Sequence, residues 1–127
     1  MKKTFYHGSQ VEGIKILKPK KDPRTKINGI FISDLPYGPM LHSLLKNRST
    51  SNVNYTTKNK RFIKGRVITK HELNKEGYLY KIKPNKKDLT IDKEGKLYLT
   101  KPIKVESCKK ITKKDVLKLG WKIKVKK

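Results

Sequence analysis

Apolar residues in this chain come in short runs, and glycine, proline, asparagine, aspartate and lysine residues interrupt them. Runs this short favour strands, because a buried helix needs apolar residues at helical spacing over a longer stretch. The clearest case is Trp121-Lys122-Ile123-Lys124-Val125, whose strict alternation predicts a strand with one buried face. Further short strands are predicted at residues 5–9, where the chain begins to leave the strand at Gly8, and at residues 30–33, 66–68, 77–82, 89–92, 97–99 and 103–105. The sequence therefore predicts a fold with more strand than helix.

Two short helices are predicted between these strands. The first follows residue 33, where Ser33 or Asp34 can provide the N-cap. Its buried side is formed by apolar residues at helical spacing, namely Met40, Leu41, Leu44 and Leu45. The second begins at Thr112, has Asp115 near the positive end of its dipole, and ends before Gly120.

Residues 49–60 are polar and show no periodic pattern, so they are predicted to form a loop. No internal repeat or domain linker interrupts the sequence. A chain of 127 residues is long enough for one domain and too short for two. Residues 1–127 are therefore expected to form a single domain of the α+β class.

Positive charge is the strongest compositional signal. The chain has 34 Lys and Arg residues against 10 Asp and Glu residues, which gives a formal net charge of +24. A charge of this size attracts polyanions at long range, so nucleic acid is the first partner to expect and an acidic protein the second. Compositional bias from an AT-rich genome is the alternative explanation, since it also enriches lysine, asparagine and isoleucine.

Cysteine content and hydropathy indicate the cellular compartment. Cys108 is the only cysteine, which excludes an intramolecular disulfide and a cysteine-based zinc site. The N-terminal Met-Lys-Lys-Thr leads into no apolar signal segment, and no run of about 18 apolar residues could span a membrane. We expect a cytoplasmic, monomeric protein without a membrane partner.

The residues Tyr6-His7-Gly8-Ser9 form a candidate small-molecule site. Glycine allows backbone conformations that other residues resist, so Gly8 is expected to end the first strand and leave His7 at its tip. A neutral imidazole offers one donor and one acceptor, and Ser9 adds a hydroxyl, which together suit a ribose diol or a phosphate. The alternative is a histidine that only bonds the backbone.

Several segments of the chain resemble one known group of proteins. They are YHGS and GIKILKP at residues 6–9 and 13–19, GIFISDLPY at 29–37, GYLY at 77–80 and LYLTKPIKV at 97–105. Their order is similar to that of the small ADP-ribosyltransferase-like proteins, whose fold is shared with poly-ADP-ribose polymerases, diphtheria-type toxins and RNA 2′-phosphotransferases. The resemblance covers most of the chain.

The resemblance implies a split pair of antiparallel β-sheets with a few short helices and a cleft that binds NAD. By similarity, His7 would bond the ribose next to nicotinamide, and the Gly8 backbone would pair with the nicotinamide amide. Phe31 or Tyr37 would supply the aromatic face on which the nicotinamide ring stacks. The other implied cofactor-binding residues are Tyr6, Ser9 and Ser33.

The catalytic glutamate of the family falls on Leu97, which cannot bond a ribose hydroxyl or stabilise a cation. Glu94 and Glu106 are the nearby carboxylates that could replace it, so together with His7 they are the catalytic candidates. For Glu106, an ion pair with surrounding lysines is the alternative.

Two functions follow from these observations. The first is an NAD-consuming ADP-ribosyltransferase, or a related glycosyl-bond enzyme, that acts on nucleic acid or an acidic protein. The second is a catalytically inactive module of the same fold that binds nucleic acid or blocks a partner through its basic surface. Tyr78, Tyr80 and Tyr98 are its candidates for stacking on bases, although Tyr78 and Tyr80 alternate as core residues would. The small size and lysine richness suit a phage or mobile-element protein.

Overall fold

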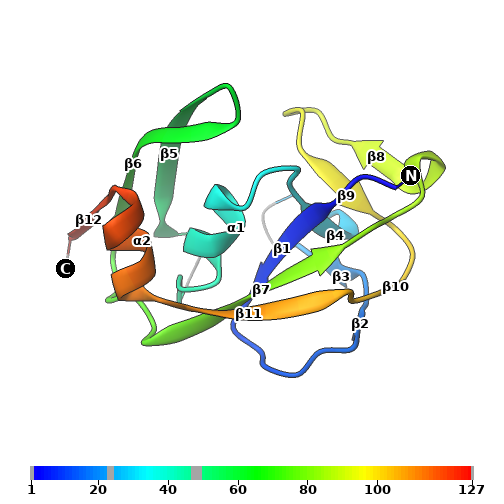
Figure 1. Cartoon of the computed structure of the whole chain (residues 1–127), viewed down its shortest axis with the longest axis horizontal. Helices are drawn as coiled ribbons and strands as arrows, with labels where there is room; N and C mark the ends of the chain where they lie inside the picture. Colours follow the sequence, from blue (N-terminus) through cyan, green and yellow to red (C-terminus); the bar gives the residue numbers. More distant parts are fainter. Residues whose placement is uncertain (1, 23–24, 47–49, 127) are drawn as a thin grey trace.

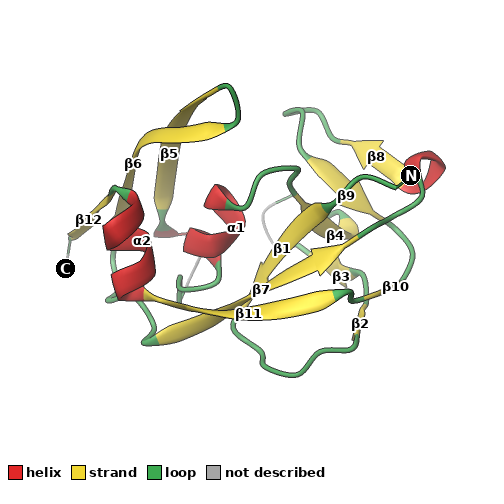
Figure 2. Cartoon of the chain, viewed as in Figure 1, coloured by secondary structure: helices red, strands yellow, loops and turns green. Residues whose placement is uncertain are grey.

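The computed structural model describes residues 2–22, 25–46 and 50–126. Strands dominate the fold, and the two α-helices are short (Figure 1, Figure 2). Neighbouring strands are antiparallel except for the parallel pair of β6 and β12. The prediction of more strand than helix is confirmed. In chain order the elements are β1 (Phe5–Ser9), β2 (Ile16–Leu17), β3 (Lys20–Lys21), β4 (Asn28–Ile32), α1 (Tyr37–His42), β5 (Asn52–Lys58), β6 (Arg61–Thr69), β7 (Glu76–Ile82), the 3-10 helix η2 (Lys86–Asp88), β8 (Leu89–Ile91), β9 (Leu97–Leu99), β10 (Ile103–Lys104), β11 (Ser107–Thr112), α2 (Lys113–Leu119) and β12 (Trp121–Val125).

The strand β7 is the centre of a three-stranded sheet in the order β1-β7-β11. Side chains alternate between the two faces of a strand, and β7 has an apolar cluster on each face. The α1-side cluster consists of Leu41, Leu44, Leu45, Val67, Leu73, Leu79, Ile111, Val116 and Trp121. The β4-side cluster consists of Phe5, Leu17, Ile30, Ile32, Tyr78, Tyr80, Ile82 and Leu99.

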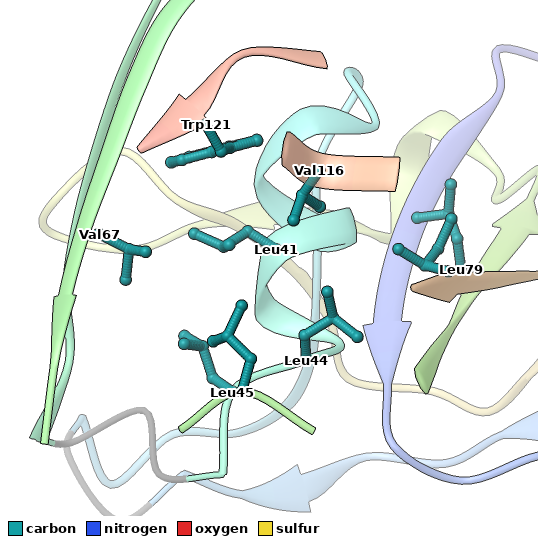
Figure 3. Close-up of a cluster of buried hydrophobic side chains, with 9 residues drawn as sticks. Leu41, Leu44, Leu45, Val67, Leu79, Val116 and Trp121 are labelled. Carbon is teal, nitrogen blue, oxygen red and sulfur yellow. The ribbon is translucent and has the colours of Figure 1, made fainter. Parts of the chain in front are cut away.

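The α1-side cluster is closed by a second three-stranded sheet in the order β12-β6-β5. Trp121 and Val67 point from this sheet toward Leu41 of α1, and Val116 reaches the same cluster from α2 (Figure 3). Gly65 lies opposite Trp121, and a Cβ at Gly65 would stand 2.7 Å from the indole Cε3. The absence of a side chain at this position lets the indole lie directly on β6.

The prediction of a loop over residues 49–60 is wrong. Residue 49 lies outside the described residues, but residues 52–58 form β5, which pairs with β6 as a hairpin. Val53 and Tyr55 face inward, whereas the outward positions are polar, as at Asn54 and Thr56. The alternation of inward and outward residues in β5 was not recognised in the sequence, because Asn and Thr occupy most of its positions.

The predicted helices both exist, but only one has the predicted cap. Thr112 and Asp115 form a reciprocal capping box at the start of α2, and Gly120 ends the helix with φ 124°, as predicted. The N-cap of α1 is Pro36, which has no side-chain cap bond, so the prediction of Ser33 or Asp34 is wrong. Hydrophobic packing holds α1 instead, through buried Leu41. The helix is shorter than predicted, because Leu44 and Leu45 are buried beyond its end at His42.

A third sheet has the order β3-β4-β9-β8. Among the described residues, it is bridged to the central sheet at a single pair, Tyr6 of β1 and Ser33 just after β4. The Tyr6 N–H donates to the Ser33 carbonyl at 2.7 Å, and the Ser33 N–H donates to the Tyr6 carbonyl at 3.0 Å. The small pair of β2 and β10 adds a further two-stranded sheet.

Candidate functional site

The candidate site lies where β1 and β4 separate beyond the bridge between Tyr6 and Ser33, and we call it the β1–β4 junction. If the antiparallel ladder continued, Gly8 would lie opposite Phe31. Instead, the Phe31 carbonyl lies 2.7 Å from Nδ1 of His7. A side chain therefore takes the place of the next backbone pair, and the two sheets split at this point.

The hydrogen bond to Phe31 defines the tautomer of His7. A carbonyl oxygen only accepts, so Nδ1 must carry the proton that it donates. In the neutral ring Nε2 is then an acceptor, which is the group that a ribose hydroxyl needs. His7 is half-buried and lies on the face of β1 that carries Phe5 of the β4-side cluster. Both its expected ligand role and the alternative, a bond to the backbone, are compatible with this geometry.

Gly8 presents its backbone at the same split. Both backbone groups of Tyr6 point toward Ser33, and alternate residues of a strand use the same edge, so the N–H and C=O of Gly8 also point to that edge. Gly8 does not end the strand, because β1 continues to Ser9 and the positive-φ glycines of the described residues lie elsewhere. The prediction that His7 lies at the strand's tip is therefore wrong.

The structural reason for a glycine at position 8 is a close approach of α1. A Cβ on Gly8 would lie 2.0 Å from the carbonyl oxygen of Pro39. The helix backbone therefore covers one face of Gly8.

The hydroxyls of the candidate site are engaged in local turns. Ser9 Oγ accepts from the N–H of Val11 at 3.1 Å, and Ser33 Oγ accepts from the N–H of Leu35 at 3.2 Å. The ring of Tyr6 packs against the α1-side cluster, on the face opposite to His7. Tyr6 thus contributes to the junction through its backbone.

The structure separates the two aromatic candidates. Phe31 belongs to the junction through its carbonyl, and its half-buried ring lies 5.6 Å from that of Tyr98 on β9. Tyr37 packs instead against Phe62 of β6 at 5.5 Å and donates its hydroxyl to the Lys60 carbonyl at 2.8 Å. Phe31 is therefore the better candidate for stacking on a ligand ring.

The two candidate glutamates lie beside different sheets. Glu94 lies in the β8–β9 turn, where its carboxylate is 3.6 Å from Lys96 Nζ and its N–H donates to Asp92 at 2.9 Å. Glu106 is exposed just before β11, and β7 separates that strand from β1. Of the two carboxylates, only Glu94 belongs to the sheet that contains Phe31.

Leu97, at the position of the family's glutamate, behaves as a core residue. It is half-buried, pairs with Ile32 and Ile91 on the flanking strands, and packs against the β4-side cluster. An apolar side chain in an apolar environment offers no bond to a ribose hydroxyl. The β1–β4 junction therefore has no carboxylate at this position.

Two tyrosine hydroxyls form contacts that the sequence patterns did not reveal. The Tyr80 hydroxyl donates to the Val11 carbonyl and accepts from the Ile14 N–H at 3.2 Å. The Tyr78 hydroxyl lies 3.0 Å from Glu12 and is likewise directed at the loop after β1. Both rings are buried, so Tyr78 and Tyr80 are core residues with hydroxyls at the edge of the sheet, and they are not free to stack on bases.

No group of three or more His, Cys, Asp and Glu side chains in the described ranges could hold a metal ion. Cys108 is exposed on β11. No helix among the described residues has the length and apolar character needed to cross a membrane.

Comparisons with known proteins add no relative to this picture. No family model matches the chain, and neither the curated proteins nor the solved structures give a match. The function is therefore inferred from the residues of the chain itself.

Proposed function

We propose that the protein is ADP-ribosyltransferase-like and binds an NAD-type nucleotide at the β1–β4 junction. The observation that carries this proposal is the split between β1 and β4, at which the His7 ring replaces the next backbone pair. Two antiparallel sheets that share a single bridge support the split pair of sheets that the resemblance implies.

The polar groups at the junction match a nicotinamide riboside in kind. Gly8 offers one N–H and one C=O on the same edge, which complement the C=O and NH₂ of a carboxamide. Nε2 of His7 can accept from a ribose hydroxyl, and the ring of Phe31 offers an aromatic face. Because Nδ1 of His7 is held by a backbone carbonyl, the imidazole is oriented before the ligand arrives, which lowers the entropy cost of binding.

Transfer of the ribosyl group is the weaker part of the proposal. Loss of nicotinamide leaves positive charge on the ribose, and a fixed carboxylate is the usual way to stabilise it. Leu97 cannot do this, and Glu94 is exposed and paired with Lys96. We therefore expect nucleotide binding with slow or no turnover, and any turnover to depend on Glu94.

Calorimetry with NAD tests the proposal on the full chain freed of nucleic acid. We expect saturable binding to the wild type and its loss in His7→Ala. His71→Ala is the matched control, because His71 is exposed after β6, and it should bind as the wild type does. Folded wild-type protein that does not bind NAD would falsify the proposal, as would equal binding by His7→Ala.

The second candidate function is a nucleic-acid-binding module without catalysis. It is favoured by the net charge of +24 and by the apolar packing of Leu97. Its affinity for nucleic acid should fall steeply with salt, because phosphate contacts release counterions, and it should be the same in His7→Ala. Loss of nucleic-acid binding in His7→Ala, with the fold intact, would contradict a function independent of the junction.

A further inference from the structure

The β12-β6-β5 sheet has one apolar and one cationic face. Trp121, Gly65 and Tyr55 lie side by side in register and face the α1-side cluster. Since side chains alternate, the next positions along β12 and β6 face the other way. Four of the outward cations of this sheet form what we call the basic sheet face: Lys64, Arg66, Lys122 and Lys124.

No acidic side chain balances this face from within its own sheet. The strands β5, β6 and β12 contain no Asp or Glu. None of the ion pairs recorded between described residues includes a member of the basic sheet face. Arg66 and Lys122 are in register on adjacent strands, which lie about 4.8 Å apart, so two like charges stand next to each other.

A polyanion removes the repulsion that this arrangement creates. Cations two positions apart on one strand are separated by about 6.8 Å, so neighbouring strands of the sheet present their charges at regular intervals. Asn54 lies beside Arg66 in the same register and bonds Asn52 at 3.1 Å, which adds neutral hydrogen-bonding groups to this face. Lys, Arg, Asn and Thr side chains are the groups that contact phosphate oxygens in nucleic-acid complexes.

The aromatic residues of this sheet are directed away from the basic sheet face. Tyr55, Phe62 and Trp121 pack against one another with ring centroids between 5.3 and 6.4 Å apart, on the inner side. Single-strand binders stack bases on aromatic side chains, and this face offers none of these three rings for that purpose. Its chemistry therefore favours contact with a phosphate backbone whose bases are already paired.

We propose that the basic sheet face binds the phosphate backbone of double-stranded nucleic acid without reading its sequence. This inference rests on the nucleic-acid-binding function and is independent of the β1–β4 junction. The sheet of β5, β6 and β12, which carries this face, lies at one end of the molecule (Figure 1).

The test compares two variants of equal net charge. One replaces the basic sheet face by glutamine, as Lys64→Gln, Arg66→Gln, Lys122→Gln and Lys124→Gln. The control replaces exposed lysines on other parts of the chain, as Lys15→Gln, Lys18→Gln, Lys86→Gln and Lys104→Gln. Fluorescence anisotropy with two unrelated DNA duplexes of equal length, and with one of the single strands, measures affinity as a function of salt.

We expect the face variant to reduce the slope of log K against log salt by about 3.6, since each phosphate contact contributes about 0.9. The control should keep a slope close to that of the wild type, and the two duplexes should bind equally. Thermal unfolding at low salt checks the fold, and the face variant should melt at or above the wild-type temperature because Arg66 and Lys122 no longer repel each other.

Four results would overturn the proposal or one of its parts. Equal slopes in the two variants, with clear wild-type binding, would mean that the charge acts diffusely and that this face is not the site. Tighter binding of the single strand, or of one duplex over the other, would overturn the duplex preference or the lack of sequence reading. Absence of wild-type binding would overturn this proposal and the nucleic-acid-binding function together, while leaving the NAD experiment unaffected.

Discussion

At the scale of single residues, the phenol of Tyr78 has an unusual environment. Its hydroxyl lies 3.0 Å from a carboxylate oxygen of Glu12 and 3.2 Å from one of Glu76, yet it has one proton to donate. Burial of the ring, followed by the two carboxylates, raises the pKa of Tyr78 to about 12 from its ordinary 10.0. The neutral phenol is therefore the form that the fold requires.

The raised pKa of Tyr78 predicts a loss of stability in alkali. Between about pH 10 and about pH 12 the unfolded chain releases the proton that the folded chain retains, so the free energy of unfolding falls over this range. Tyr78→Phe should show a shallower fall, because phenylalanine has no proton to lose. Urea unfolding between these pH values measures the difference, with Tyr98→Phe as the half-buried control. An equal fall in wild type and Tyr78→Phe would rule out this role.

The resemblance of several segments to one group of proteins pointed to His7, Gly8 and Phe31, and these residues do meet. The short apolar runs predicted the two strands but not that they lie side by side. The reason for glycine at position 8 was missed, since it depends on the carbonyl of Pro39 in an element remote in sequence. A pattern in one stretch carries no information on what a distant backbone atom will approach.

At the scale of elements, the capping box makes α2 the best-defined helix. Thr112 Oγ1 accepts from the Asp115 N–H, and the Asp115 carboxylate accepts from the Thr112 N–H at 2.8 Å. Thr112→Ala should lower the free energy of unfolding by about 1 kcal/mol, because it removes one half of the box. Urea unfolding measures this, and exposed Lys114→Ala in the same helix should cost less than about 0.5 kcal/mol. Equal effects of the two substitutions would show that the cap contributes nothing.

Elements were predictable where their signal is local. The caps of α2 and the alternation of β12 depend on residues that are close together in the sequence, and both predictions are confirmed. β11 was missed because its sequence SCKKIT is mostly exposed and only Ile111 is buried. Its place in a sheet comes from pairing with β7, which no nearby residue indicates.

At the scale of the whole molecule, long-range pairing decides the architecture. The order β1-β7-β11 and the parallel pair of β6 with β12 join segments that are far apart in the chain. Short apolar runs predicted the excess of strand, and composition predicted an attraction to polyanions, but net charge alone does not say which face is free of carboxylates. That property appears only when β12 is aligned with β6 and Lys122 comes to lie beside Arg66.

The position of β7 between the two apolar clusters has a consequence for cooperativity. Leu79 belongs to the α1-side cluster and Tyr80 to the β4-side cluster. Unfolding of either cluster would therefore expose one face of β7 to water. We expect a single transition, with coincident midpoints from Trp121 fluorescence on one side and near-UV tyrosine dichroism on the other. Two separated midpoints would mean that the halves melt independently. If they melt together, a ligand bound on either side protects the entire chain, so one thermal-shift assay can detect partners at both surfaces.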